Sequence, residues 1–541
     1  MKKIFSVLLA LCSMALYAQK SAAPKLVVGI VIDQMRSDYL YRYADRMGKG
    51  GFHTLLNQGF YFSHAQYNYV PTYTGPGHAS IFTGTTPAVH GIIGNNWYMK
   101  ESEYTVYCTE DSLVLPVGTN KKAGKMSPRL MLSSTIGDEL KLQYKESKVI
   151  GIALKDRSSI LPAGHSADAA YWFEFKSGTF ISSSHYMQQL PEWVQRFNAD
   201  NLSKKYLQQG WQTLYSIDSY NQSTQDSNPY EYIPKSFGNK VFPYTFQSSL
   251  EKEDYEVIKY TPYGNSITKD FAIEAIKSEK LGQRGVSDLL TISFSSTDYA
   301  GHAFGPRSIE IEDMYLRLDK DIAEIIATLD KEVGKDNYII FLTADHGACD
   351  VPHLLANNKI PSGYVHEDQL ATHIKQYCKQ EFGDSLLISY INQQIFLNEK
   401  YIEQHKLNKS EIEAKISQYL LAYNGISEAY PSAYLKYHSY HPDFLKYKIQ
   451  KGYNHKRSGD IAISYLPGWM EYMPAGTTHG SSYNYDTHVP LIFYGKSIAK
   501  GRSVSQVNIT DIAPTISTLL GIPYPNGNTG HPIKELWENK K

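Results

Sequence analysis

Leu26-Val-Val-Gly-Ile-Val-Ile-Asp33 is a run of apolar, mostly β-branched residues that ends in a carboxylate. Continuous apolar runs of this length are typical of strands buried on both faces of a parallel sheet. Four later runs have the same character, at 149–154, 289–294, 338–342 and 489–494. Segment 309–329 has apolar residues at helical spacing. This alternation predicts an α/β sandwich with helices on both faces of a mainly parallel central sheet.

Acids and histidines follow these runs. Asp33 ends the first run, Asp298 follows the third, and Asp345-His346 closes the fourth. Open parallel sheets place ligand sites beyond the carboxyl ends of their strands, so residues far apart in the chain can meet in one cleft. Six residues are candidate metal ligands: Asp33, Asp298, His302, Asp345, His346 and His479. Such oxygen and nitrogen ligands suffice for two divalent metal ions.

A single threonine is the candidate nucleophile. Thr74 lies in Tyr69-Val-Pro-Thr-Tyr-Thr-Gly-Pro-Gly-His-Ala-Ser80, and we expect a helix to begin at His78–Phe82. Free amides at such a helix start favour a phosphoryl group. A threonine hydroxyl is a weak nucleophile, but coordination to a metal can activate it. The spacing of the six ligands does not by itself divide them between two ions.

These motifs resemble the alkaline phosphatase superfamily, especially its nucleotide pyrophosphatase/phosphodiesterase-like branch. The likeness also includes His90-Gly-Ile-Ile-Gly-Asn95 and the tail Asp511-Ile-Ala-Pro-Thr-Ile-Ser-Thr-Leu-Leu-Gly521. It implies two Zn²⁺ ions, a phosphothreonine intermediate on Thr74, and an Asn95 amide that binds a phosphoryl oxygen. It also implies the division of ligands. Asp298, His302 and His479 would hold one ion, and Asp33, Asp345, His346 and the Thr74 oxygen the other.

Lys155-Asp-Arg157 decides between branches of this superfamily. We expect the pair to continue the strand at 149–154, where residues two apart share a face and both cations point into the cleft. A phosphate monoester dianion offers them one more charged oxygen than a diester does. With Ile160-Leu-Pro-Ala-Gly-His165, the pair resembles the monomeric phosphate-irrepressible alkaline phosphatases of bacteria. The predicted function is hydrolysis of phosphate monoesters. A phosphodiesterase on the same fold and a catalytically silent binding protein are the alternatives.

The N-terminus indicates export. Residues 1–18 contain two lysines and an apolar run of about 13 residues, a pattern typical of a signal peptide and too short for a membrane anchor. We therefore expect a periplasmic or secreted protein. The equal numbers of basic and acidic residues, 54 each, give no global charge for binding nucleic acid.

The mature chain is expected to form one catalytic domain over 24–541. Two polar, tyrosine-containing segments, at about 165–265 and 350–475, are predicted to be insertions that cap the cleft. Three cysteines follow the signal peptide, at Cys108, Cys349 and Cys378, so either one disulfide with a free thiol or three thiols is possible. The resemblance favours a monomer that acts on small phosphate esters.

Overall fold

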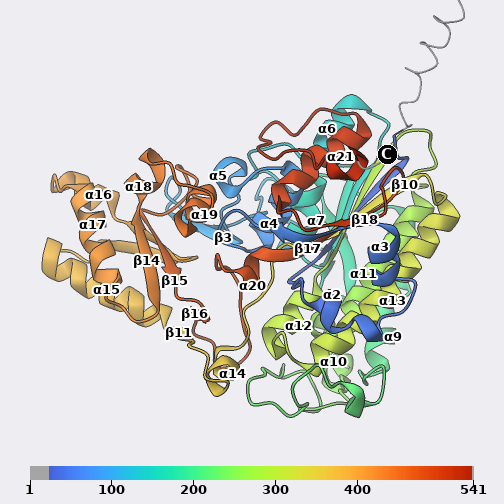
Figure 1. Cartoon of the computed structure of the whole chain (residues 1–541), viewed down its shortest axis with the longest axis horizontal. Helices are drawn as coiled ribbons and strands as arrows, with labels where there is room; N and C mark the ends of the chain where they lie inside the picture. Colours follow the sequence, from blue (N-terminus) through green and yellow to red (C-terminus); the bar gives the residue numbers. More distant parts are fainter. Residues whose placement is uncertain (1–22, 539–541) are drawn as a thin grey trace, which may run out of the picture.

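The computed structural model describes residues 23–538, and an eleven-stranded sheet lies at its centre (Figure 1). The strand order is β18-β2-β17-β10-β1-β9-β6-β7-β8-β5, with β19 also paired to β2. The pairs β10–β1, β1–β9, β9–β6 and β6–β7 are parallel, whereas β17 is antiparallel to both β10 and β2. The predicted α/β sandwich with a mainly parallel sheet is confirmed.

The five apolar runs are all strands of this sheet. They are β1 (Leu26–Ile32), β6 (Val149–Ala153), β9 (Asp288–Phe294), β10 (Tyr338–Thr343) and β17 (His488–Gly495). The remaining strands are β2 (Phe60–Gln66), β5 (Pro116–Val117), β7 (Ala169–Glu174), β8 (Thr179–Ser183), β18 (Gly501–Ser503) and β19 (Val507–Asn508). Val28 in β1 aligns with Leu290 and Ile340 of its neighbours, and all three are fully buried.

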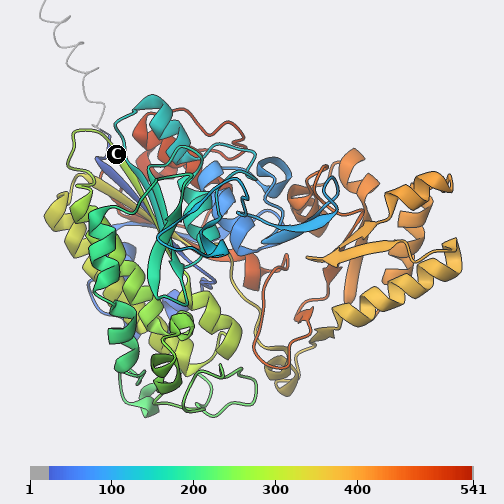
Figure 2. The ribbon, with the colours of Figure 1, turned by 180° about the vertical axis from the view of Figure 1, so that it is seen from behind.

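Helices cover both faces of the sheet (Figures 1 and 2). One layer contains α3 (Phe52–Gln58), α11 (Pro262–Ser278) and α13 (Ile309–Glu332). The other contains α4 (Thr74–Thr83), α6 (Ile136–Gln143), α7 (Asp156–Ala163) and α21 (Ile512–Leu520). The helix predicted at 309–329 is α13, which begins where Ser308 Oγ accepts a hydrogen bond from Ile311 N at 3.2 Å.

The segment 165–265 differs from the prediction in part. Its first strands, β7 and β8, belong to the central sheet and are not part of an insertion. The Ala-Ala-Tyr-Trp-Phe-Glu sequence of β7 is buried throughout, so aromatic side chains here pack inside the sandwich. The rest of the segment is irregular, with short helices α8 (Glu192–Ala199), α9 (Leu202–Gln208) and α10 (Gln247–Glu251).

Residues 363–471 form a second module beside the sandwich (Figure 1). Its antiparallel sheet has the order β12-β13-β15-β14, from β12 (Leu387–Ile391), β13 (Gln394–Leu397), β15 (Ile461–Tyr465) and β14 (Ile426–Pro431). Helices α15 (Glu367–Phe382), α16 (Glu399–Gln404) and α17 (Lys409–Leu420) pack on it around a separate core that includes Ile374, Ile395 and Ile416. The module begins and ends at the parallel pair β11 (Gly363–Val365) and β16 (Trp469–Glu471).

Three further predictions concern the cysteines, membrane-spanning helices and the signal peptide. Cys108, Cys349 and Cys378 are buried free thiols, which selects the three-thiol alternative. Within residues 23–538 no helix is long and apolar enough to cross a membrane. The predicted signal peptide, residues 1–18, lies outside the described residues.

Candidate active site

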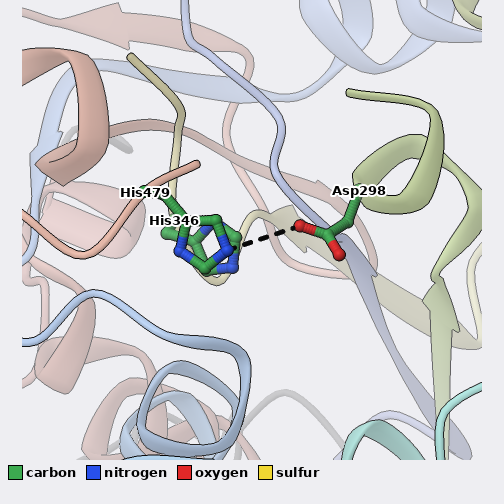
Figure 3. Close-up of side chains that lie close together, drawn as sticks. All are labelled: Asp298, His346 and His479. Carbon is green, nitrogen blue, oxygen red and sulfur yellow. Dashed lines mark ion pairs between the residues drawn. The ribbon is translucent and has the colours of Figure 1, made fainter. Parts of the chain in front are cut away.

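The six candidate ligands meet beyond the carboxyl ends of β1, β9 and β10. Oxygen and nitrogen atoms of five of them form two groups, which share His346 and whose members lie within 4.8 Å of one another. Asp33, Asp345 and His346 make one group, and Asp298, His346 and His479 make the other. Figure 3 shows the second group, in which Asp298 Oδ1 is 3.5 Å from His479 Nε2. His302 lies at its edge, with Nε2 3.2 Å from Asp298 Oδ1.

Backbone carbonyls orient all three imidazoles. A carbonyl oxygen only accepts, so each Nδ1 carries the proton and each Nε2 keeps a lone pair, as metal ligation requires. The His346 and His479 rings stack with their centroids 3.5 Å apart, so both Nε2 atoms face the same space (Figure 3). The Nδ1 bonds run from His302 to Thr477 O at 2.8 Å, from His346 to Gly347 O at 2.9 Å and from His479 to Thr72 O at 2.7 Å.

Three buried atoms of this cluster have no hydrogen-bond partner among the described residues. They are Asp33 Oδ1, Asp345 Oδ2 and His346 Nε2, and all belong to one of the two groups. Burial and the nearby Asp345 carboxylate raise the pKa of Asp33 well above its ordinary value. Unpaired charge in such a site is costly, and a cation offsets that cost. The mixture of carboxylate and imidazole therefore fits a divalent ion such as zinc.

Thr74 is the first residue of α4, four positions earlier than the predicted helix start at His78. The prediction was wrong because Gly75-Pro76-Gly77 continues into the helix: Pro76 suits its first turn. Gly77 is needed for packing, since a Cβ there would lie 2.5 Å from Asp345 O. The first turn of α4 therefore packs directly against Asp345, the acid that follows β10.

Asn95 binds the beginning of the same helix. Its Oδ1 accepts a hydrogen bond from Gly75 N at 2.8 Å, so only its amide N–H groups remain to donate to a ligand. Asn96 instead begins β3 (Asn96–Met99) and is exposed. His90 supports this loop: Nδ1 accepts from Ile92 N at 3.1 Å while Nε2 bonds Ser80 Oγ at 2.9 Å. Burial lowers the pKa of His90 to about 3, which keeps this arrangement neutral.

Lys155 and Arg157 are not on an extended strand as predicted. β6 ends at Ala153, Lys155 precedes α7, and Arg157 is the second residue of that helix. Residues two apart in a helix differ by about 200° in direction, so the shared-face argument does not hold. Lys155 nevertheless reaches the cluster, with Nζ 2.7 Å from Asp33 Oδ2 and 2.5 Å from Asp298 Oδ2.

Lys155 also lies near the nucleophile, and Arg157 follows it in the first turn of α7. Lys155 Nζ is 3.5 Å from Thr74 Oγ1. Burial lowers the pKa of Lys155, but the carboxylates of Asp298 and Asp33 raise it more, so the pKa lies above its ordinary value and the ammonium stays charged. Arg157 Nη1 donates to Tyr107 OH at 3.0 Å, while its buried Nε has no partner among the described residues. A free guanidinium N–H in this position suits an anionic ligand.

Further residues contact the ligands or the nucleophile, and one of them, Gln34, had almost no signal in the sequence. Gln34, in the left-handed region at φ 64°, donates from its backbone N to Asp345 Oδ1 and from Nε2 to Asp298 Oδ1. Its one hint is that it follows Asp33 directly. His78, from the same motif as Thr74, donates from Nδ1 to Thr74 O at 2.9 Å and contacts Ser293 Oγ. His165 makes a different contact: its backbone carbonyl accepts a hydrogen bond from His185 Nε2 at 3.1 Å.

Residues 27–488 match the family model described as type I phosphodiesterase / nucleotide pyrophosphatase. The chain belongs to this family. A "calcium-transporting ATPase" of Myroides odoratus is 45% identical, covering 98% of this chain and 99% of that protein. Alkaline phosphatase PhoV of Synechococcus elongatus is 44% identical, covering 96% of this chain and 94% of PhoV. The crystal structure of alkaline phosphatase PafA matches with a TM-score of 0.92 and 42% sequence identity, and the match covers 96% of this chain and 100% of that chain. The resemblance inferred from the motifs is thus confirmed.

Proposed function

We propose that this protein is an alkaline phosphatase, a hydrolase of phosphate monoesters. Its near full-length similarity to PhoV and PafA supports the activity. The observation that carries the proposal within this chain is that the Lys155 ammonium is 3.5 Å from Thr74 Oγ1, while Arg157, two residues on, has a buried Nε without a partner among the described residues. Such a pair can bind the charged oxygens of a phosphoryl group placed at Thr74.

The six acids and histidines would hold two zinc ions. Asp33, Asp345 and His346, with the Thr74 oxygen, would bind one, as their unpartnered buried atoms suggest. Asp298, His302 and His479 would bind the other, although the compact group on that side contains His346 rather than His302. When bound, such ions lower the pKa of a coordinated hydroxyl and stabilise negative charge on attacking and leaving oxygens.

Two displacements at phosphorus make up the reaction. Thr74 Oγ1 loses its proton and forms a bond to phosphorus as the bond to the substrate alcohol breaks, which gives phosphothreonine and a free alcohol. Water then bonds to phosphorus, the bond to Thr74 breaks, and phosphate leaves. Lys155, Arg157 and the Asn95 amide bind the nonbridging oxygens in both steps. Positioned donors of this kind supply a large part of a catalytic rate.

A nucleotide pyrophosphatase/phosphodiesterase is the second candidate, because the matching family model carries that description. Replacing Lys155 or Arg157 by alanine separates the two. A monoesterase should lose about 10²-fold or more in kcat/KM on a phosphate monoester and much less on a diester, since one charged oxygen is missing there. Equal losses on both substrates would remove the assigned role of the pair.

The remaining parts of the chain have supporting roles in this proposal. Residues 1–18 would direct export to the periplasm or the medium, and the mature chain would act as a monomer. The second module would cap the cleft. Its Gln393 and Glu471 line a small pocket together with Tyr73 and His479.

A further inference from the structure

Asp486, which is not one of the proposed ligands, joins the two loops that carry the stacked histidines. It lies in α20 (Asn484–Thr487), directly before β17, and is 1% exposed. Its Oδ2 accepts hydrogen bonds from Gly480 N at 3.1 Å and from Ser481 N at 2.7 Å. Its backbone carbonyl accepts a third hydrogen bond, from Gly347 N at 2.8 Å. This one residue therefore holds the backbone that follows each of the two histidines.

Two glycines allow the loops to approach Asp486 this closely. A Cβ on Gly347 would lie 2.1 Å from Tyr485 O, so the backbone of α20 leaves no room for a side chain there. Gly480 has a φ of 122°, and a Cβ on it would lie 2.6 Å from Tyr73 Cε1. Glycine adopts such positive φ values without strain. The two glycine amides thus lie against α20, and buried N–H groups of this kind need an acceptor.

The same loops orient the imidazole rings. His479 Nδ1 donates to Thr72 O at 2.7 Å, and Thr72 Oγ1 donates to Ser481 O at 2.9 Å. His346 Nδ1 donates to Gly347 O at 2.9 Å, so Gly347 orients that ring with its carbonyl while its N–H is fixed on α20. The ring centroids are only 3.5 Å apart (Figure 3). Displacing either loop would therefore change the spacing of the two Nε2 atoms.

We propose that Asp486 is a positioning residue that sets the spacing of His346 and His479, and through them the geometry of the two zinc sites. This role rests on the proposed zinc-dependent function. Asp486 belongs to neither ligand group among the described residues, and its Oδ1 has no partner there, so the role falls to Oδ2 and the backbone carbonyl. A neutral amide oxygen can accept the same two bonds as Oδ2. The role therefore requires an acceptor and not a charge.

The test measures how fast zinc leaves the zinc-loaded mature protein. Transfer of zinc to a chromogenic chelator is followed in the wild type, Asp486→Ala and Asp486→Asn, and kcat and KM on a phosphate monoester are measured at saturating zinc. Asp486→Ala should lose zinc about 10–100-fold faster and lower kcat by a similar factor with little change in KM, because residues that orient metal ligands have effects of this size. Asp486→Asn should restore both rates to within a few-fold of the wild type, because its amide oxygen accepts both bonds.

A matched control is Asp319→Ala. Asp319 is 2% exposed, and its two oxygens accept hydrogen bonds from Gly48 N and Phe52 N at 2.7 Å each, between α13 and α3. This variant should lower the thermal midpoint about as much as Asp486→Ala. It should leave the rate of zinc loss unchanged, because neither bond holds a loop that carries a proposed ligand. Equal acceleration by both variants would show that Asp486 is only structural and would overturn the proposal.

A second variant keeps the test decisive if Asp486→Ala does not fold. Thr72→Val removes the hydroxyl that donates to Ser481 O but keeps the carbonyl that accepts from His479, so it loosens the same loop from its other side. We expect zinc loss several-fold faster than in the wild type. Zinc that leaves Asp486→Ala or Thr72→Val at the wild-type rate would overturn the positioning role.

Failure of the proposed function gives a different result, because then the wild type itself would bind no zinc or hydrolyse no monoester. The positioning role is in that case read from the imidazole NMR signals of His346 and His479 in the metal-free protein. Asp486→Ala should shift these signals, whereas Asp319→Ala should leave them in place. Signals that stay unchanged in Asp486→Ala would overturn the proposal independently of zinc.

Discussion

The three central strands that lead to the active site, β1, β9 and β10, are mostly apolar and are buried along their whole length. The strands of the second module are different: β12 and β14 carry partly exposed polar and aromatic residues. Strands covered on both faces hold their ends rigidly, and the acids and histidines follow those ends. The module has its own core, and its Gln393, Tyr465 and β16 line a small pocket beside His479. We infer that the residues that follow the central strands carry out the chemistry, and that the second module lines one side of the cleft.

The largest expected loss of activity comes from a substitution on the side of the cleft that the central sheet forms. Thr74→Ala should lower kcat on phosphate monoesters by about 10³-fold or more, because the nucleophile of a covalent mechanism is lost. Zinc content should stay near that of the wild type, since the acids and histidines remain. Rapid quench with a labelled substrate should show phosphothreonine in the wild type and none in the variant. Near wild-type turnover of the zinc-replete variant would contradict the covalent mechanism.

Removing the metal should lower turnover about as strongly as Thr74→Ala does, because the proposed ligands lie on the same side of the cleft as Thr74. Dialysis against a chelator should abolish turnover, and added zinc should restore it. Asp345→Asn should prevent full recovery, because Asp345 Oδ2 is one of the buried atoms without a partner. Bound zinc is counted in parallel by mass spectrometry. If the stripped protein kept its rate, the metal assignment would fail.

A matched pair of core substitutions tests whether the two cores are independent. Ile292 in β9 and Ile416 in α17 are both fully buried, one in each core. Alanine at either position should cost about 2–5 kcal/mol of unfolding free energy. Ile292→Ala should also speed the loss of zinc, because β9 leads to Asp298. Ile416→Ala should leave the zinc loss rate unchanged, and equal acceleration by both would show that the regions are coupled.

The smallest effect is expected where the module touches the cleft. Asn392, in the β12–β13 turn, donates from Nδ2 to Asn96 O at 2.5 Å, next to the residue that binds Gly75. Asn392→Ala should lower kcat/KM less than about tenfold, as one exposed neutral hydrogen bond is worth about 1 kcal/mol. Thermal stability should hardly change. A loss as large as that of Thr74→Ala would place the module within the catalytic machinery.

The sequence was most informative where burial is complete. The five apolar runs predicted the central strands to within one or two residues, and the acids after them predicted a shared cleft. Prediction failed where tertiary packing decides the local structure. Lys155 and Arg157 looked like a strand continuation, yet α7 begins at Asp156, and β7 was hidden by its polar and aromatic neighbours. The role of Gln34 depends on contacts that no local pattern records.

The most direct test of the central claim compares kcat/KM on an aryl phosphate monoester with that on the matching diester. The measurement uses zinc-loaded mature protein at alkaline pH. A strong preference for the monoester is the predicted result, because the Lys155 ammonium lies 3.5 Å from Thr74 Oγ1 and the buried Nε of Arg157 has no partner among the described residues, so both could bind the additional charged oxygen. A preference for the diester would contradict the phosphatase assignment and move the protein to the phosphodiesterase activity named by its family.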